Sequence, residues 1–287
     1  MECAIPARYG RRMKLDDVQP GHCHARAQRL FGELRLVREE MGRTEDTRPI
    51  LEIVGAMPRA CYFEAIAAWH KAERLGVETG ARTARSAPAV PLLQDLRPGH
   101  VLQMIDAVLA QVDEIKKRLG ITEHGTDAVI DTSRQPSDVL GVLMRVNREL
   151  SCLLEHAFSP RDVYRVVALA SAYAARLTST VVTPQPAVFE RRRRPTDCYH
   201  QLEVCLAKVG ALVVRRGGAA LQVHDTPSAI TPSDVYDLAN LVLCEVAYLH
   251  SLHKDAAVLH AFEPGAAGYC LPAHVYQLAR TLEGQLS

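Results

Sequence analysis

An acid or a histidine stands two residues before a tyrosine at four places in the second half of the chain: Asp162 and Tyr164, Asp197 and Tyr199, Asp234 and Tyr236, and His274 and Tyr276. Carboxylates and imidazoles accept hydrogen bonds, and a phenol both donates and accepts them. If the four segments meet in space, these side chains form a polar ring that could hold a small molecule or a peptide. The eight residues are therefore candidates for a ligand-binding site.

A dense run of positive charge directly precedes the second of these segments, in the sequence ERRRRPTD. Guanidinium groups bind carboxylates and phosphates through paired hydrogen bonds, so the run could contact an anion or an acidic partner. The alternative interpretation is a solvated linker. Aromatic residues make up only 5% of the chain and do not interleave with basic ones, so we expect no nucleic-acid binding. The candidate anion or partner contacts are Arg191, Arg192, Arg193 and Arg194.

Histidines occur in two close pairs, His22 with His24 and His250 with His253. The second pair has the i, i+3 spacing at which two helical side chains could face one metal ion, but no cysteine or carboxylate accompanies either pair at ligand spacing. The chain contains no Glu-x-x-His, glycine-rich phosphate loop or nucleophile elbow. The sequence thus predicts no metal, no cofactor and no catalytic residue.

Each acid and tyrosine pair belongs to a longer pattern that begins at a proline. The pattern occurs eight times, at Pro20, Pro58, Pro98, Pro136, Pro160, Pro195, Pro232 and Pro272. Residues 3, 7, 10, 14 and 17 positions after the proline are apolar in every copy that extends that far, which is the spacing of one buried helical stripe. Proline suits the first helical position, and an acid two residues later meets the positive end of the helix. The pattern therefore predicts eight amphipathic helices.

This pattern gives the candidate site residues a second interpretation. The acids would stabilise helix starts, with Ser159 and Thr231 as further caps, and need not bind a ligand. The tyrosines would pack between helices. Because a buried phenol needs a hydrogen-bond partner, we expect most of them to bond a neighbouring backbone group or acid.

The spacing of the prolines predicts the domain organisation. Only 24 residues separate Pro136 from Pro160, whereas the other intervals are longer. We therefore expect an all-α fold of two tandem four-helix bundles with long extended linkers: residues 1–19 as an N-terminal extension, 20–157 as the first half and 158–287 as the second. The alternative is an α-solenoid of helical hairpins. The linkers are long enough to let the helices of one half run parallel, and both orders remain open.

Composition limits the classes of function that we expect for the chain. The net charge of +1 provides no field to attract nucleic acid or membranes, and no apolar run approaches the ~18 residues that a membrane span needs. The N-terminus has no apolar signal segment, so we expect a cytoplasmic protein. The predicted function is a non-enzymatic helical-repeat module for protein interaction or small-ligand sensing, with an unknown protein or small molecule as partner. The alternative is a metal-binding or enzymatic bundle that uses histidines and tyrosines near the helix starts.

Overall fold

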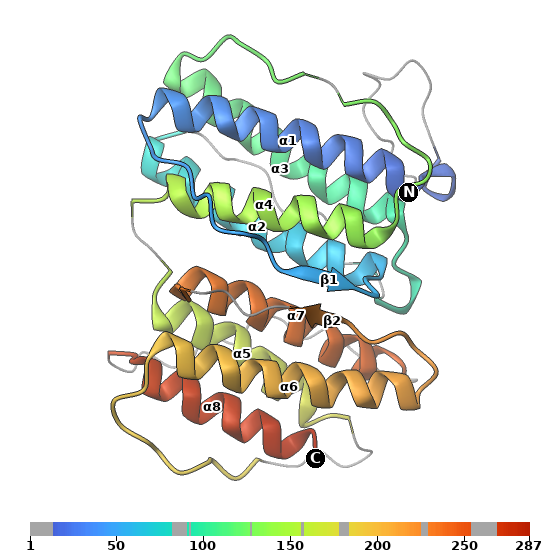
Figure 1. Ribbon diagram of the computed structural model, residues 1–287, viewed down its shortest axis with the longest axis vertical. Helices are drawn as coiled ribbons and strands as arrows, with labels where there is room; N and C mark the ends of the chain where they lie inside the picture. Colours follow the sequence, from blue (N-terminus) through green and yellow to red (C-terminus); the bar gives the residue numbers. More distant parts are fainter. Residues whose placement is uncertain are drawn as a thin grey trace. The chain divides into compact units, whose positions relative to one another are not determined.

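The computed structural model describes residues 14–81, 91, 93–126, 128–155, 158–177, 184–224, 229–253 and 269–287. These ranges contain eight α-helices, which confirms the predicted all-α fold (Figure 1). The helices are α1 (Pro20–Glu40), α2 (Pro58–Thr79), α3 (Pro98–Leu119), α4 (Pro136–Leu153), α5 (Pro160–Ala174), α6 (Pro195–Arg215), α7 (Pro232–Ser251) and α8 (Pro272–Gln285). The shorter elements are the 3₁₀-helices η1 (Leu15–Asp17) and η2 (Leu93–Asp95) and the strands β1 (Glu52–Val54) and β2 (Gln222–His224). None of the helices in these ranges is long and apolar enough to cross a membrane.

Every helix begins at a proline of the repeat, and the residue before that proline is extended. Thr231, for example, has φ −102° and ψ 162°. In seven helices the backbone N–H of this residue donates to a side chain three positions later, which is His22, His100, Asp138, Asp162, Asp197, Asp234 or His274. The exception is α2, where that position is Ala60. The side chain supplies a partner to a backbone group that the helix leaves unpaired.

The apolar stripe of the repeat forms the core. All of its described positions are buried except Leu177 and Leu212, which are half-buried. Leu177 differs because α5 ends at Ala174 and does not extend to this position. The period of the apolar residues therefore identifies the buried face of each helix.

The chain divides into two compact units with four helices each. The first comprises Met1–Ile50, Ala56–Pro91 and Asp95–Glu155, and the second comprises Leu51–Gly55, Leu92–Gln94 and His156–Ser287. The second unit contains the two strands, which pair antiparallel with Glu52 opposite His224 and Val54 opposite Gln222.

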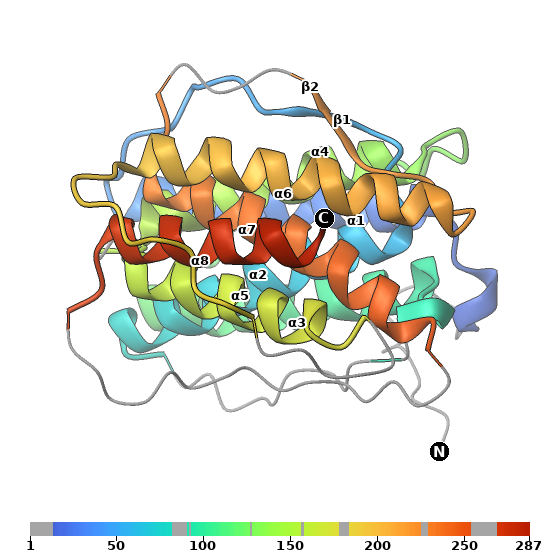
Figure 2. The same cartoon turned by 90° about the horizontal axis from the view of Figure 1, so that it is seen from below.

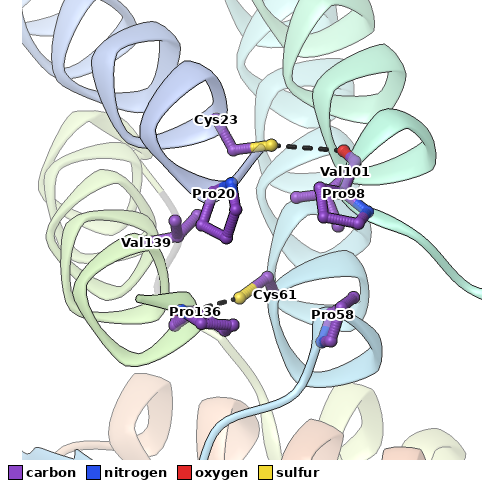
Figure 3. Close-up of a pocket in the computed structure, with 8 residues that line it drawn as sticks. All are labelled: Pro20, Cys23, Pro58, Cys61, Pro98, Val101, Pro136 and Val139. Atoms are coloured by element: carbon purple, nitrogen blue, oxygen red, sulfur yellow. Dashed lines mark hydrogen bonds between the residues drawn. The ribbon is translucent and has the colours of Figure 1, made fainter. Parts of the chain in front are cut away.

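The four helices of the first unit run parallel. Both α1 and α2 pack against α3 and α4. The helix starts meet at one end of the unit, where an apolar pocket of about 10 Å³ is lined by Pro20, Pro58, Pro98 and Pro136 (Figure 3). Beside it, the Cys23 thiol donates to the carbonyl oxygen of Pro98 and the Cys61 thiol to that of Pro136, each over 3.2 Å. This pocket has room for only about one water molecule.

The second unit repeats this arrangement, with α7 and α8 each packed against α5 and α6 (Figure 2). The Cys198 thiol donates to the Pro272 carbonyl oxygen over 3.2 Å, which places the starts of α6 and α8 together. Near the opposite end, the rings of Tyr173 on α5 and His250 on α7 lie 5.1 Å apart. Within each unit the helices therefore begin at the same end.

Candidate functional site

The arginine run belongs to a surface segment that lies along α8, and we call residues 184–194 the basic strap. The strap appears in yellow beside α8 in both views (Figures 1 and 2). The Gln277 side chain donates to the Ala187 carbonyl oxygen over 2.7 Å, and the Ala187 N–H donates to Thr281 Oγ1 over 3.0 Å. Two side chains of α8 therefore satisfy both backbone groups of Ala187 and fix the path of the strap.

Further contacts fix the strap closer to the start of α6. The ring of Phe189 lies 5.0 Å from that of His274. Glu190 accepts hydrogen bonds from Arg193 and from Arg280, the latter over 3.1 Å, and the Arg193 bond lowers the pKa of Glu190. The Arg193 guanidinium also lies 4.2 Å from the centre of the Tyr276 ring, a cation–π geometry. Arg193 therefore holds the strap in place.

The other three arginines of the run point outward. Arg191, Arg192 and Arg194 are exposed, and within the described ranges their guanidinium groups have no acidic partner. Val188 is 80% exposed beside them, and Phe189 is 39% exposed. The strap therefore presents three available cations next to an apolar side chain on a backbone that α8 holds in one conformation.

These arginines are unfavourable for local stability. Arg192 adopts φ 62°, in the left-handed region, which costs a non-glycine residue about 1 kcal/mol. Arg194 occupies the N-cap of α6, a position that Ser, Thr, Asp or Asn stabilises best. Cations also repel the positive end of a helix. Because none of these choices favours folding, the arginines point to a role outside the fold.

The candidate acids and His274 lie at the end of the second unit where its helices begin, and each caps its own helix. Asp197 accepts the Arg194 N–H over 2.7 Å. In the other helices Asp162 accepts from Ser159, Asp234 from Thr231, and His274 Nδ1 from the Leu271 N–H, over 2.7–3.0 Å. Ligand binding by these groups would have to use their remaining lone pairs.

The candidate tyrosines differ from one another. Tyr199 is completely buried, and its hydroxyl has no hydrogen-bond partner among the described residues, contrary to the expected bond to a backbone group or acid. Burial raises its pKa, as do the charges of nearby acids. Tyr236 packs on Phe158 with ring centres 4.3 Å apart. Tyr164 and Tyr276 are half-buried, so the four phenols do not share one environment.

The histidine pairs take part in local contacts. His22 Nδ1 accepts the Gln19 N–H over 3.0 Å. His250 packs on Tyr173 and lies 6.4 Å from the ring of His253. Across the described part of the chain, no three histidine, cysteine, aspartate or glutamate side chains come together in a group that could hold a metal ion.

Comparison with known proteins gives no relative: no protein-family model, no curated protein and no solved structure matches the chain. The functional argument therefore rests on the strap itself. Sequence reasoning identified its arginines but missed Val188 and Phe189 and the residues of α8 that hold it. The sequence VFERRRR contains the signal of an apolar pair beside the charges, whereas Gln277 and Thr281 follow no local motif.

Proposed function

We propose that this protein is a non-enzymatic interaction module that binds an acidic segment of a partner protein through the basic strap. The three outward arginines, Arg191, Arg192 and Arg194, carry the proposal, because they form an exposed cationic group at a place where they oppose helix formation. Val188 provides the apolar contact that such interfaces usually add to their charges.

The chemistry of the strap favours carboxylates as the complementary groups. Arginine binds a carboxylate through two parallel hydrogen bonds, and three arginines within four residues suit a segment with several acids. Because the strap is already held by Gln277, Thr281 and Tyr276, binding requires little ordering of its backbone. An acidic partner segment with one or two apolar side chains fits these features.

Fluorescence anisotropy with a labelled peptide of aspartate and glutamate interrupted by leucine tests the proposal. We expect binding that weakens as salt is raised, because the contact is between exposed charges. Changing Arg191, Arg192 and Arg194 together to serine should reduce the affinity at least tenfold, since hydrogen bonds between charged groups contribute about 1.5–3 kcal/mol each.

The matched control changes Arg215 and Arg216 to serine, because these exposed arginines at the other end of α6 lie outside the strap. This variant should bind the peptide as the wild type does. Equal losses in both variants would show nonspecific charge attraction. Tighter binding of a single-stranded oligonucleotide than of the peptide would assign the strap to nucleic acid and refute the proposal.

A further inference from the structure

A second feature lies in the first unit, where the linker after α1 covers the surface between α1 and α4. An open pocket of about 340 Å³ is lined there by Phe31 of α1, by residues 45–50 of the linker, and by Arg145, Arg148 and Glu149 of α4. This volume is within the range of small-molecule binding sites, which begins near 300 Å³. The pocket near the helix starts is far smaller.

The pocket wall is held by hydrogen bonds from α4. Arg148 donates to the carbonyl oxygens of Arg48 and Pro49, the latter over 3.1 Å. Arg48 in turn binds Asp46 through both carboxylate oxygens, over 2.6–3.0 Å. The linker residues that line the pocket are therefore fixed before any ligand arrives.

Three arginines line the pocket, and they differ in their acidic partners. Glu149 is buried and binds Arg38, which also lies 3.6 Å from Glu45. Asp46 is paired with Arg48, as described above, and also lies 3.8 Å from Arg148. Arg145 is exposed and has no acidic partner among the described residues. Because each carboxylate of the lining already contacts an arginine among the described residues, the guanidinium of Arg145 is the lining group that can bind an added anion.

We propose that this pocket binds a small organic anion, with its phosphate or carboxylate group on Arg145 and a flat apolar part against Phe31. A guanidinium matches both anionic groups through two hydrogen bonds. The Phe31 ring is half-buried and provides the apolar wall that orients such ligands in most pockets. The site is separate from the basic strap and does not depend on the function proposed for it.

Titration followed by NMR tests this proposal with three probes: phenyl phosphate, benzoate and inorganic phosphate. We expect phenyl phosphate or benzoate to shift the resonances of residues around the pocket and to bind more tightly than inorganic phosphate, which lacks the ring. The stronger of the two aromatic probes identifies the anionic group. Arg145→Gln should weaken this probe about tenfold or more, because it removes a charged hydrogen-bond donor from an exposed position.

Two further variants make the test specific. Phe31→Leu should weaken the aromatic probes and leave inorganic phosphate unchanged. Arg35→Gln is the matched control, since this exposed arginine of α1 is outside the pocket lining, and it should change nothing. The proposal would be overturned if a saturating concentration of the probe shifted no resonance at the pocket. It would also be overturned if Arg35→Gln and Arg145→Gln lost equal affinity for the probe.

Discussion

Glu33 and Lys116 form a buried ion pair between neighbouring parallel helices, although 83 residues separate them in the sequence. Glu33 is 13 positions after the proline of α1, and Lys116 is 18 positions after the proline of α3. Glu149 of α4 and Arg38 of α1 form a second pair with the same two offsets. Because the helices run parallel and begin at the same end, an acid 13 positions after one proline lies beside a base 18 positions after another.

Removing one member of the first pair should strongly destabilise the first unit. We expect Lys116→Met to lower the free energy of unfolding by about 3 kcal/mol, because it removes one of the two arginine or lysine partners of a completely buried carboxylate and leaves Glu33 with Arg29, 3.6 Å away. Restoring neutrality with Glu33→Gln in the same chain should recover part of the loss. The single tryptophan, Trp69 of α2, reports this unfolding by fluorescence in urea. Lys117→Met removes an exposed pair with Glu114 and should have no measurable effect.

A charge in the core stripe should disrupt the second unit. Val163 is 2% exposed at the third position after its proline, so Val163→Asp buries a carboxylate without a partner. We follow the helical signal by circular dichroism during unfolding. A large part of this signal should lose its cooperative transition. Val214→Asp is the control, because Val214 is 57% exposed. Melting of Val163→Asp like the wild type would show that the stripe is not the core.

The helices were predictable because their signals are local. A proline, an acid and an apolar period act within one helix, so the starts and buried faces could be assigned from neighbouring residues. The parallel order was left open, since the stripe shows which face is buried and not the direction of the helix. Contacts such as that between Cys23 and Pro98, 75 residues apart, decide the direction.

The candidate sites were also only partly predictable, because they depend on contacts between residues far apart in the sequence. The four arginines stand out as consecutive charges, but their different roles depend on distant residues such as Tyr276, whose ring contacts the guanidinium of Arg193. The pocket around Arg145 could not be predicted, because its lining comes from α1, a linker and α4. The hydroxyl of Tyr199, which has no partner in the described part of the chain, also departs from the general rule that buried phenols find partners.

The buried cysteines should be unreactive in the folded protein. Burial raises the pKa of Cys23 and of Cys198 to about 12, and each thiol donates to a proline carbonyl oxygen. Because the thiolate is the reactive form, modification by Ellman's reagent at pH 8 should be on the order of a thousandfold slower than in urea. Mass mapping of the labelled peptides measures this. Rapid labelling of either cysteine in the native protein would contradict the described helix starts.

Acid should weaken the fold through His250. Burial lowers the pKa of His250 in the folded protein, and the charges of His253 and Arg176 lower it further. The unfolded chain therefore takes up this proton first, so the free energy of unfolding should decrease as the pH falls below about 6.5. Urea denaturation between pH 8 and pH 5 measures the slope, and His250→Gln should reduce it. An equal slope in His250→Gln and in the wild type would contradict this assignment.

Replacing Arg194 by threonine should stabilise the protein and weaken its binding to the acidic peptide. Threonine at this N-cap could accept the Asp197 N–H, as Thr231 accepts the Asp234 N–H in α7. We expect a gain of about 1 kcal/mol in the free energy of unfolding. The reverse change, Thr231→Arg, should lose a similar amount and leave peptide binding unchanged. Destabilisation by Arg194→Thr would show that this arginine supports the fold, and the argument that it is retained for a partner would fail.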